Sequence, residues 1–236
     1  MAGVSDASDP GATIQWPLAQ PWPSAHPPLR LAVLASGEGS NFEALVNACH
    51  HGPLNGEVVL LVVNKEQCGA RQRAERLDVP CCWIDHRAYG SREALDAALI
   101  ERFQAAAVDL VVMAGWMRIV TPVLIEAYPD RLLNIHPSLL PSFRGADGVG
   151  QALAAGVRLS GCTAHLVRPE VDSGPILVQA AVPVLQTDDA ASLAARIHRQ
   201  EHRILPLAVA LAAERLVRDK TAAAVAPSPP PARPAD

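Results

Sequence analysis

The sequence predicts an α/β fold, a Rossmann-like and mostly parallel sheet flanked by helices, with a C-terminal antiparallel strand pair and a long closing helix. Three observations support this prediction. Short apolar runs alternate with helical stretches over the earlier part of the chain. Two β-rich runs, at 162–167 and 176–184, are joined by a turn-forming segment, and the apolar residues after about 189 recur at helical spacing.

Seven strands are expected, near residues 30–35, 57–63, 81–84, 109–113, 131–136, 161–167 and 176–184. The plainest of the intervening helices is 91–106, because Ser91 can cap its first turn and Leu95, Leu99 and Phe103 form an apolar stripe. The closing helix should run from about 189 to 217, and we expect Pro206 to kink it.

Length, charge and composition indicate one folded domain whose two flanking segments differ from it in composition. The chain has 236 residues and a formal net charge of −4, which argues against a nucleic-acid partner attracted by charge. About half of the 21 prolines lie in residues 1–29 and 220–236. We therefore expect a disordered Pro/Ala-rich extension at 1–29, a folded domain at 30–219 and a disordered Pro/Ala-rich tail at 220–236.

The sequence also indicates the cellular compartment in which the protein acts. No Lys or Arg precedes Arg30 and no long apolar run is present, so we expect no signal peptide, transit peptide or membrane span. Five cysteines, an odd number without a repeated spacing, are typical of reduced thiols. These features predict a cytoplasmic protein. We expect a monomer or homodimer, although the sequence does not determine which.

The main chemical signal lies in residues 132–141. Side chains alternate across a strand, so Asn134 and His136 point to one face of an otherwise apolar strand. Pro137 ends the pairing and leaves the imidazole at the carboxyl end of the strand, where α/β sheets bind ligands. An amide donor beside an imidazole can stabilise an oxyanion and move a proton, as acyl or formyl transfer requires. Taken alone, the pair fits an ordinary polar strand terminus equally well.

A glycine loop follows the first expected strand. Residues 36–41 contain Gly37 and Gly39 and lead into a helix, so its free backbone N–H groups can bind an anion such as phosphate. The loop has neither the lysine of a nucleotide P-loop nor the third glycine of the dinucleotide fingerprint. A tight strand-to-helix turn is the simpler alternative.

Two carboxylates can complete a site. Asp172 lies on the connection between the last two strands, where it can orient an imidazole, although Asp before Ser-Gly-Pro is also ordinary turn chemistry. Glu201 interrupts the inward stripe of the last helix, either as a paired core charge or as a ligand contact. His198, Glu201 and His202 also spell the H-x-x-E-H zinc signature, which we disfavour because no third ligand follows well downstream.

Together these residues resemble the folate-dependent formyltransferase superfamily, and most closely the phosphoribosylglycinamide formyltransferases of purine synthesis. The resemblance covers about residues 29–217. It rests on Ser36-Gly37-x-Gly39-Ser40-Asn41, Asn64-Lys65, Ala114-Gly115-x-Met117-Arg118-Ile119, Asn134-x-His136-Pro137-Ser138-Leu139-Leu140-Pro141, Val171-Asp172-x-Gly174 and Gln200-Glu201-His202, in that order. One stretch departs from the pattern, because Gly148-Val149-Gly150 stands where many relatives carry a histidine.

The resemblance implies a role for each motif. The catalytic trio would be Asn134, His136 and Asp172. The substrate site would comprise Gly37, Gly39, Ser40, Asn41 and Glu201, and the folate site would comprise Arg92, Met117, Arg118, Ile119 and Val120. The implied reaction transfers the formyl group of 10-formyltetrahydrofolate, the co-substrate, to the amine of glycinamide ribonucleotide, with small-molecule partners only and without a metal.

Two other interpretations stay open. The same Asn-x-His and Asp arrangement resembles formyltetrahydrofolate hydrolase and methionyl-tRNA formyltransferase, although the acidic net charge and the loop at 36–41 disfavour tRNA. Outside enzymes, the chain would be a phosphometabolite- or folate-binding module without turnover. The complete trio disfavours that alternative, because binding alone does not require an oxyanion donor beside a base.

Overall fold

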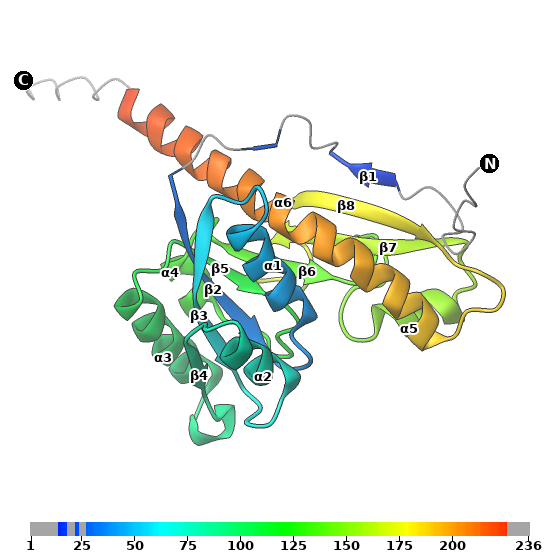
Figure 1. Ribbon diagram of the computed structural model, residues 1–236, viewed down its shortest axis with the longest axis horizontal. Coiled ribbons are helices and arrows are strands. Elements are labelled where there is room, and N and C mark those ends of the chain that lie inside the picture. The colour runs from blue at the N-terminus through cyan, green and yellow to red at the C-terminus, as the bar shows by residue number, and fades with distance from the viewer. Residues whose placement is uncertain (1–13, 18–21, 24–26, 226–236) are drawn as a thin grey trace, which may run out of the picture.

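The computed structural model describes residues 14–17, 22–23 and 27–225. Within them, eight strands form one sheet in the order β1-β8-β7-β6-β5-β2-β3-β4 (Figure 1). The strands are β1 Ile14–Trp16, β2 Leu29–Ala35, β3 Gly56–Val63, β4 Cys81–Trp83, β5 Leu110–Met113, β6 Leu132–His136, β7 Leu159–Leu166 and β8 Ile176–Pro183. All seven expected strands are confirmed, with ends that differ from the expected ones by two residues at most.

The sheet divides into a parallel and an antiparallel part. The strands from β6 to β4 are parallel, whereas β6, β7, β8 and β1 pair antiparallel. The expected α/β class and the antiparallel pairing of the last two strands are therefore confirmed. The antiparallel part is larger than expected, because β6 and β1 join on either side of that pair.

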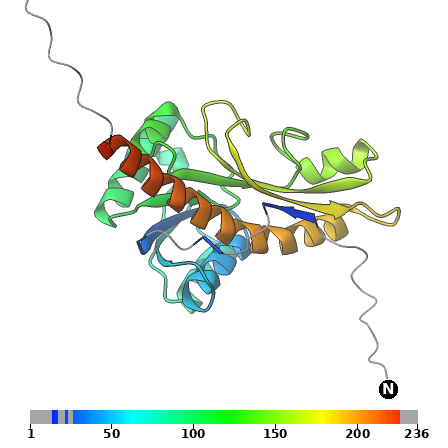
Figure 2. The same ribbon diagram turned by 90° about the horizontal axis from the view of Figure 1, so that it is seen from above.

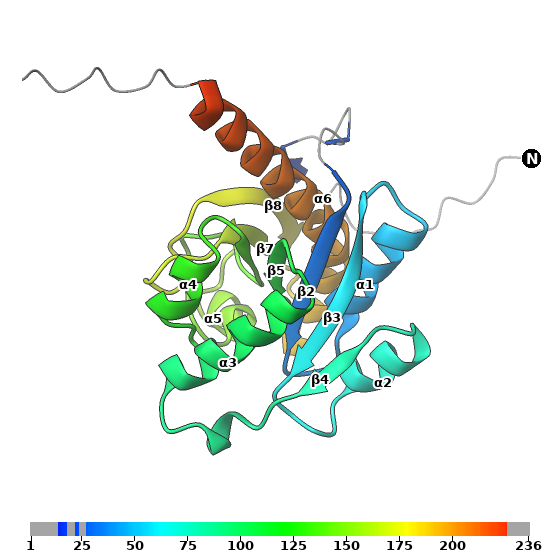
Figure 3. The same ribbon diagram turned by 90° about the vertical axis from the view of Figure 1, so that its left-hand side faces the viewer.

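The helices pack in two layers on the sheet (Figure 3). They are α1 Ser40–His50, α2 Gly69–Arg76, α3 Arg92–Ala105, α4 Pro122–Ala127, α5 Gly148–Ala154 and α6 Ala190–Val225, with a short 3₁₀ helix at His86–Ala88. One apolar core lies under α1, α2 and α6, and a second lies under α3 and α4. Strand β2 contributes to both cores, with Leu31 and Val33 in the first and Ala32 and Leu34 in the second, as a central strand buried on both faces must.

Helix α6 is the long closing helix, and Figure 2 shows it lying across the sheet. The helix continues through Pro206 and ends at Val225, beyond the expected end near 217. Residues 221–225 are Thr-Ala-Ala-Ala-Val, and alanine is the strongest helix former, which explains the extension. None of the helices in the described residues combines the length and apolarity needed to cross a bilayer.

The N-terminal segment differs from the expectation. The composition of the first 29 residues led us to expect that residues 14–16 are disordered. Instead they form β1 and pair with β8 in the register Ile14↔Ala181. Without β1, β8 would present an unpaired row of backbone groups at the sheet edge, so this pairing has a clear physical reason. The rest of the expected extension and the end of the expected tail, 226–236, largely lie outside the described residues.

Helix α3 generates a test of the second core. Phe103 is fully buried and packs edge-to-face on Tyr128, with ring centroids 5.7 Å apart. Phe103→Ala should lower the free energy of unfolding by about 3–5 kcal/mol, because the core cannot fill the volume of the lost ring. Gln104→Ala, at an exposed position of the same helix, should change it by less than about 0.5 kcal/mol. Denaturant unfolding monitored by circular dichroism measures both, and equal midpoints would contradict the assigned core.

Candidate active site

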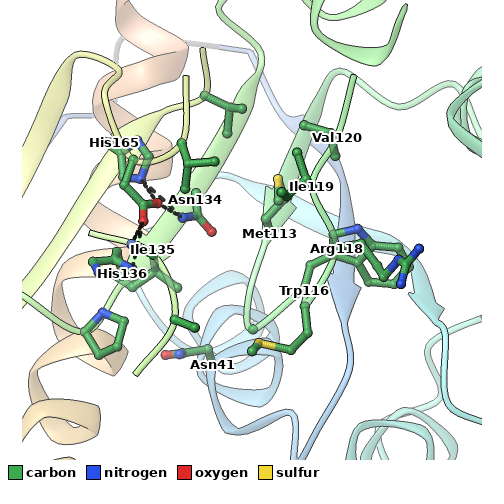
Figure 4. Close-up of a pocket in the computed structure, with 18 of the residues that line it drawn as sticks. Asn41, Met113, Trp116, Arg118, Ile119, Val120, Asn134, Ile135, His136 and His165 are labelled. Carbon is green, nitrogen blue, oxygen red and sulfur yellow. Dashed lines mark hydrogen bonds and ion pairs between the residues drawn. The ribbon is translucent and has the colours of Figure 1, made fainter. Parts of the chain in front are cut away.

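A cavity of about 690 Å³ opens at the carboxyl ends of the parallel strands, where β2, β5 and β6 lead into their loops. Figure 4 shows three groups of side chains around it. Asn134, His136 and His165 form one group on the antiparallel side, and Met113, Ile119 and Val120 form the opposite wall. Asn41 approaches from the start of α1.

The structure brings together Asn134, His136 and Asp172. Alternation along β6 places the first two on the same side of the strand, and Asp172 reaches them from the loop between β7 and β8. Asn134 Nδ2 donates to Asp172 Oδ1 at 3.3 Å, and His136 Nδ1 lies 3.4 Å from Asp172 Oδ2. The side chains of His136 and Asp172 are only 7% and 8% exposed. The structure therefore places the three side chains of the predicted trio beside one another.

Asp172 is held as a carboxylate. Burial would raise its pKa, but hydrogen bonding with His165 and with the Gly145 N–H, together with the charge of His136, outweighs burial and lowers the pKa below its usual value. Gly145 N–H donates to Oδ2 at 2.8 Å, and His165 Nε2 lies 3.5 Å from Oδ1. Asp172 is consequently ionised at neutral pH and can attract a proton to the neighbouring imidazole.

His136 is placed to hold a proton between two acceptors. Its Nε2 lies 2.8 Å from the Phe143 carbonyl, which can only accept, so Nε2 carries a hydrogen. Its Nδ1 faces the carboxylate of Asp172. A second proton, on Nδ1, would satisfy both acceptors at once, so the pair can take up and release a proton at Nδ1 without moving the ring.

His165 belongs to the same cluster, and the sequence analysis missed it. Its Nδ1 donates to the Leu166 carbonyl at 2.9 Å, and its Nε2 lies 3.2 Å from Asn134 Nδ2. The contact arises because β6 and β7 pair antiparallel with Asn134 opposite His165. A histidine within the otherwise apolar run 162–167 was the available signal, but only knowledge of the strand register connects it to Asn134.

The loop 36–41 joins β2 to α1, and its two glycines have different surroundings. Gly39 adopts a left-handed conformation with φ 76°, and a Cβ there would lie 2.5 Å from the Ala70 Cα of α2. A Cβ on Gly37 would meet nothing within 4 Å. Gly39 is therefore required for packing against α2, whereas Gly37 leaves open space beside the loop.

Asn41 and Glu201 meet at the start of α1. Glu201 is 3% exposed, as its predicted inward position on α6 requires, and its Oε2 accepts hydrogen bonds from Asn41 Nδ2 and His198 Nδ1, both at 2.8 Å. Both Asn41 and Glu201 line the cavity, whereas Gly37, Gly39 and Ser40 precede Asn41 and are not among the lining residues. In the described part of the chain, no three His, Cys, Asp or Glu side chains are arranged as metal ligands.

The wall formed by residues 117–120 follows β5. All four expected residues, Met117, Arg118, Ile119 and Val120, line the cavity. Hydrogen bonds to buried side chains of other elements hold both ends of this wall in place. Met117 N–H donates to Ser36 Oγ at 2.9 Å, and Thr121 N–H donates to the Asp96 carboxylate at 2.6 Å.

Arg92 does not join this wall, and its expected place in the folate site stays a prediction. It is the exposed first residue of α3 and is not among the residues that line the cavity. The topology explains this position, because α3 follows β4, an edge strand that lies three places away from β5 in the sheet.

The segment Gly148-Val149-Gly150, which departs from the family pattern, begins α5. The Asp147 carboxylate caps this helix by accepting from Gly150 N–H at 3.0 Å. A Cβ on Gly148 would lie 3.3 Å from His136 Nε2. A small residue at 148 therefore allows α5 to begin directly beside the imidazole of His136.

The structure is an α/β protein with a mixed sheet, an Asn-x-His strand end and a loop aspartate beside a cavity. Comparisons with known proteins identify the family. The Formyl transferase family model matches residues 29–209. The chain belongs to the formyl transferase family.

Individual relatives support this assignment. Phosphoribosylglycinamide formyltransferase of Bacillus subtilis is 40% identical over 75% of this chain and 91% of its own length. The structure of glycinamide ribonucleotide transformylase 1 from Symbiobacterium toebii has 47% identity and a TM-score of 0.78 over 79% of this chain and 88% of that one. The trifunctional purine biosynthetic protein adenosine-3 of Gallus gallus is 43% identical over 80% of this chain, which spans only 19% of that relative's length.

The surroundings of Gly39 and Gly37 predict that replacement by alanine lowers the free energy of unfolding at the first position only. Gly39→Ala should lower the free energy of unfolding by more than about 2 kcal/mol, because it combines a left-handed residue with a clash against α2. Gly37→Ala should remain within about 0.5 kcal/mol of the unmodified protein. Urea unfolding of the two variants measures the difference, and a Gly39→Ala variant of unchanged stability would contradict the described packing of α2.

Proposed function

We propose that this chain transfers the formyl group of 10-formyltetrahydrofolate to the amine of glycinamide ribonucleotide, a step of de novo purine biosynthesis. The observation that carries the proposal is the position of the trio between two differently built halves of one cavity. Asn41 and Glu201 offer polar contacts on one side, and residues 117–120 offer a largely apolar wall on the other. The names of the full-length bacterial relatives agree with this reaction.

The ribonucleotide belongs on the polar side. Its phosphate would bind at the N-terminal end of α1, where residues 37–41 present backbone N–H groups and the helix dipole favours an anion. Glu201 would accept hydrogen bonds from the hydroxyl or amine groups of the substrate. Its Oε2 is already bonded to Asn41 and His198, whereas Oε1 has no partner among the described residues and remains for the ligand.

The folate belongs on the apolar side. Met117 and Ile119 are 69% and 52% exposed, and both line the cavity. Exposed apolar side chains beside a cavity are suited to the faces of a flat aromatic ring system. The formyl group of a folate placed there would face the trio across the cavity.

The reaction then needs only positioned hydrogen bonds and one proton path. The substrate amine attacks the formyl carbon, and the carbonyl oxygen becomes the oxyanion of a tetrahedral intermediate. The attacking nitrogen then loses a proton, the departing folate nitrogen gains one, and the bond between the formyl carbon and the folate nitrogen breaks. Asn134 would donate an N–H to the oxyanion, and protonated His136 would stabilise it by its charge, because both ring nitrogens of His136 already face the Phe143 carbonyl and Asp172. Asp172 would orient His136 and help to pass the proton to the departing nitrogen. The proposed steps include no metal.

Asn134 can stabilise the oxyanion by giving up one of the two contacts that its amide nitrogen makes. Its Nδ2 lies 3.3 Å from Asp172 Oδ1 and 3.2 Å from His165 Nε2. Both separations are at or beyond the long end for hydrogen bonds, so one N–H can turn to a developing negative charge with little loss. His165 would then act as a support for the Asn134 amide.

Formyltetrahydrofolate hydrolase is the main alternative, because water can replace the amine as the nucleophile at the same trio. A spectrophotometric assay of folate deformylation separates the two reactions. Deformylation should require glycinamide ribonucleotide and yield the formylated ribonucleotide in equal amount. Turnover that ignores the ribonucleotide would indicate the hydrolase, and binding of both ligands without turnover would indicate a binding module.

Asp172→Asn tests the catalytic role against a turn-forming role. Asn also tolerates the left-handed conformation of this residue, φ 50°, so the variant should fold. Without the carboxylate, His136 loses its charged partner, and kcat should fall at least ~10²-fold, the scale of a lost acid–base contributor. The limb of the pH profile due to the pair should shift or disappear.

Asp78→Asn is the matched control, because Asp78 is also left-handed, φ 54°, but exposed and absent from the cavity lining. It should retain the kcat of the unmodified enzyme. If Asp172→Asn stays within about threefold of the control in kcat, with the same pH profile, the carboxylate takes no part in the chemistry.

Gly37→Ala tests the phosphate loop with a variant that the fold tolerates. A methyl group beside the loop should hinder the approach of the phosphate and raise KM for the ribonucleotide about tenfold, while KM for the folate stays constant. Steady-state kinetics with each substrate varied in turn provides the measurement. An unchanged KM for the ribonucleotide would remove the phosphate from this loop.

A further inference from the structure

A buried carboxyl group lies behind the apolar wall of the cavity, and none of the steps above uses it. Asp96 belongs to α3 and is 2% exposed. Its Oδ2 accepts a hydrogen bond of 2.6 Å from the N–H of Thr121, which follows the wall and precedes α4. Asp96 is not among the residues that line the cavity. Any influence of Asp96 on a ligand would therefore act through the wall.

The wall depends on backbone hydrogen bonds for its shape. Residues 114–121 form neither helix nor strand. The flanking side chains of this segment pack in the second core, but Met117 and Ile119 are exposed and face the cavity. Side chains in open space do not fix the backbone that carries them. The path of this exposed part is therefore set by the hydrogen bonds at its two ends, to Ser36 Oγ and to Asp96.

The anchor at Asp96 is rigid. Helix α3 is held in the second core by Leu95, Leu99 and Phe103, which are 3% exposed or less. Because Leu95 immediately precedes Asp96, this turn of the helix cannot shift without disturbing a close-packed core. The acceptor of the Thr121 N–H is therefore fixed in space, and the end of the wall is fixed with it.

Packing alone does not explain an acidic side chain at this position. Burial raises the pKa of Asp96 above its usual value, hydrogen bonding with Thr121 opposes this rise only in part, and Glu93 adds to it. No cation in the described part of the chain contributes to the balance. A buried carboxyl group without a cation is costly for stability. The hydrogen bond to the Thr121 N–H gives this side chain a role that an apolar residue could not take.

We propose that Asp96 is a positioning residue for the formylfolate, because its carboxyl group holds the end of the wall against which the folate ring system lies. A fixed wall presents Met117 and Ile119 in advance, so that binding does not have to order them. Without the acceptor, the Thr121 N–H loses its partner and the wall gains conformations that must be given up when the folate binds. The inference rests on the proposed function, which assigns the folate to this wall.

Substitutions of Asp96 separate the hydrogen bond from the size of the side chain. Asp96→Leu is similar in size but has no acceptor, whereas Asp96→Asn keeps an acceptor and loses only the charge. KM for formylfolate should rise about tenfold in Asp96→Leu, the scale of one lost hydrogen bond to a charged group. In Asp96→Asn it should stay within about threefold of the unmodified enzyme. KM for the ribonucleotide should stay constant in both variants.

A purely structural role of Asp96 predicts a different pattern, and two further variants expose it. Leu99→Ala opens a cavity in the second core on the same helix but keeps the hydrogen bond of Asp96. It should lower the urea midpoint and keep both KM values, because loss of folded protein lowers only the measured maximal rate. Asp96→Ala is too small to clash, should match Asp96→Leu, and replaces it if that variant does not fold.

Two kinetic outcomes would overturn the inference and leave the proposed function intact. The first is an unchanged KM for formylfolate in Asp96→Leu or its Ala replacement. The second is a Leu99→Ala variant whose KM for formylfolate rises as much as that of Asp96→Leu. If the unmodified protein shows no deformylation that depends on the ribonucleotide, the proposed function itself is refuted.

Amide hydrogen exchange and direct binding test the anchor without activity. The Thr121 N–H should be protected in the unmodified protein and in Asp96→Asn, and it should exchange at least about tenfold faster in Asp96→Leu. The Kd of 10-formyltetrahydrofolate, measured by isothermal titration calorimetry, should rise in the same variant. Retained protection of Thr121 in Asp96→Leu, or faster exchange with an unchanged Kd, would overturn the inference.

Discussion

The buried carboxylate of Asp172 is the interaction on which the rest of the site depends. It receives the Asn134 amide from β6 and the Gly145 N–H from the following loop, and it lies beside His136 and His165. A single charged group thus connects β6, β7 and two loops that are distant in sequence. An unpaired carboxylate is strongly disfavoured when it is buried. The hydrogen bonds that satisfy this charge therefore also hold these elements together.

The backbone around this carboxylate is strained. Asp172 itself, Phe143 and Asp147 all have positive φ, at 50°, 57° and 58°. Each such conformation costs about 1–2 kcal/mol for a residue with a side chain. The Phe143 carbonyl is thereby aimed at His136, and the Gly145 N–H at Asp172. The strain therefore lies where it orients hydrogen-bond partners of His136 and Asp172, as is common at functional sites.

Local periodicity was sufficient to predict much of the fold and part of the site. Apolar runs located the strands, alternation placed Asn134 and His136 together, and helical spacing turned Glu201 inward. Contacts set by the register of distant strands could not be predicted in this way. His165 meets Asn134 only because β7 returns antiparallel to β6, and Arg92 lies outside the cavity only because β4 is an edge strand. The packing of Gly39 on α2 has the same tertiary origin.

Hydrogen bonds connect the glycine loop on one side of the cavity to the apolar wall on the other. Ser36, the first residue of the glycine loop, donates its N–H to the Gly115 carbonyl and accepts from Met117 N–H. The glycine loop and the apolar wall are therefore held by the same residue. Neighbouring strands β2 and β5 carry these loops, and the sheet therefore sets the distance between them. Within that frame the carboxylates of Asp172 and Glu201 are each balanced by histidine. Because each carboxylate keeps an imidazole beside it, neither is left as an unpaired charge inside the cavity.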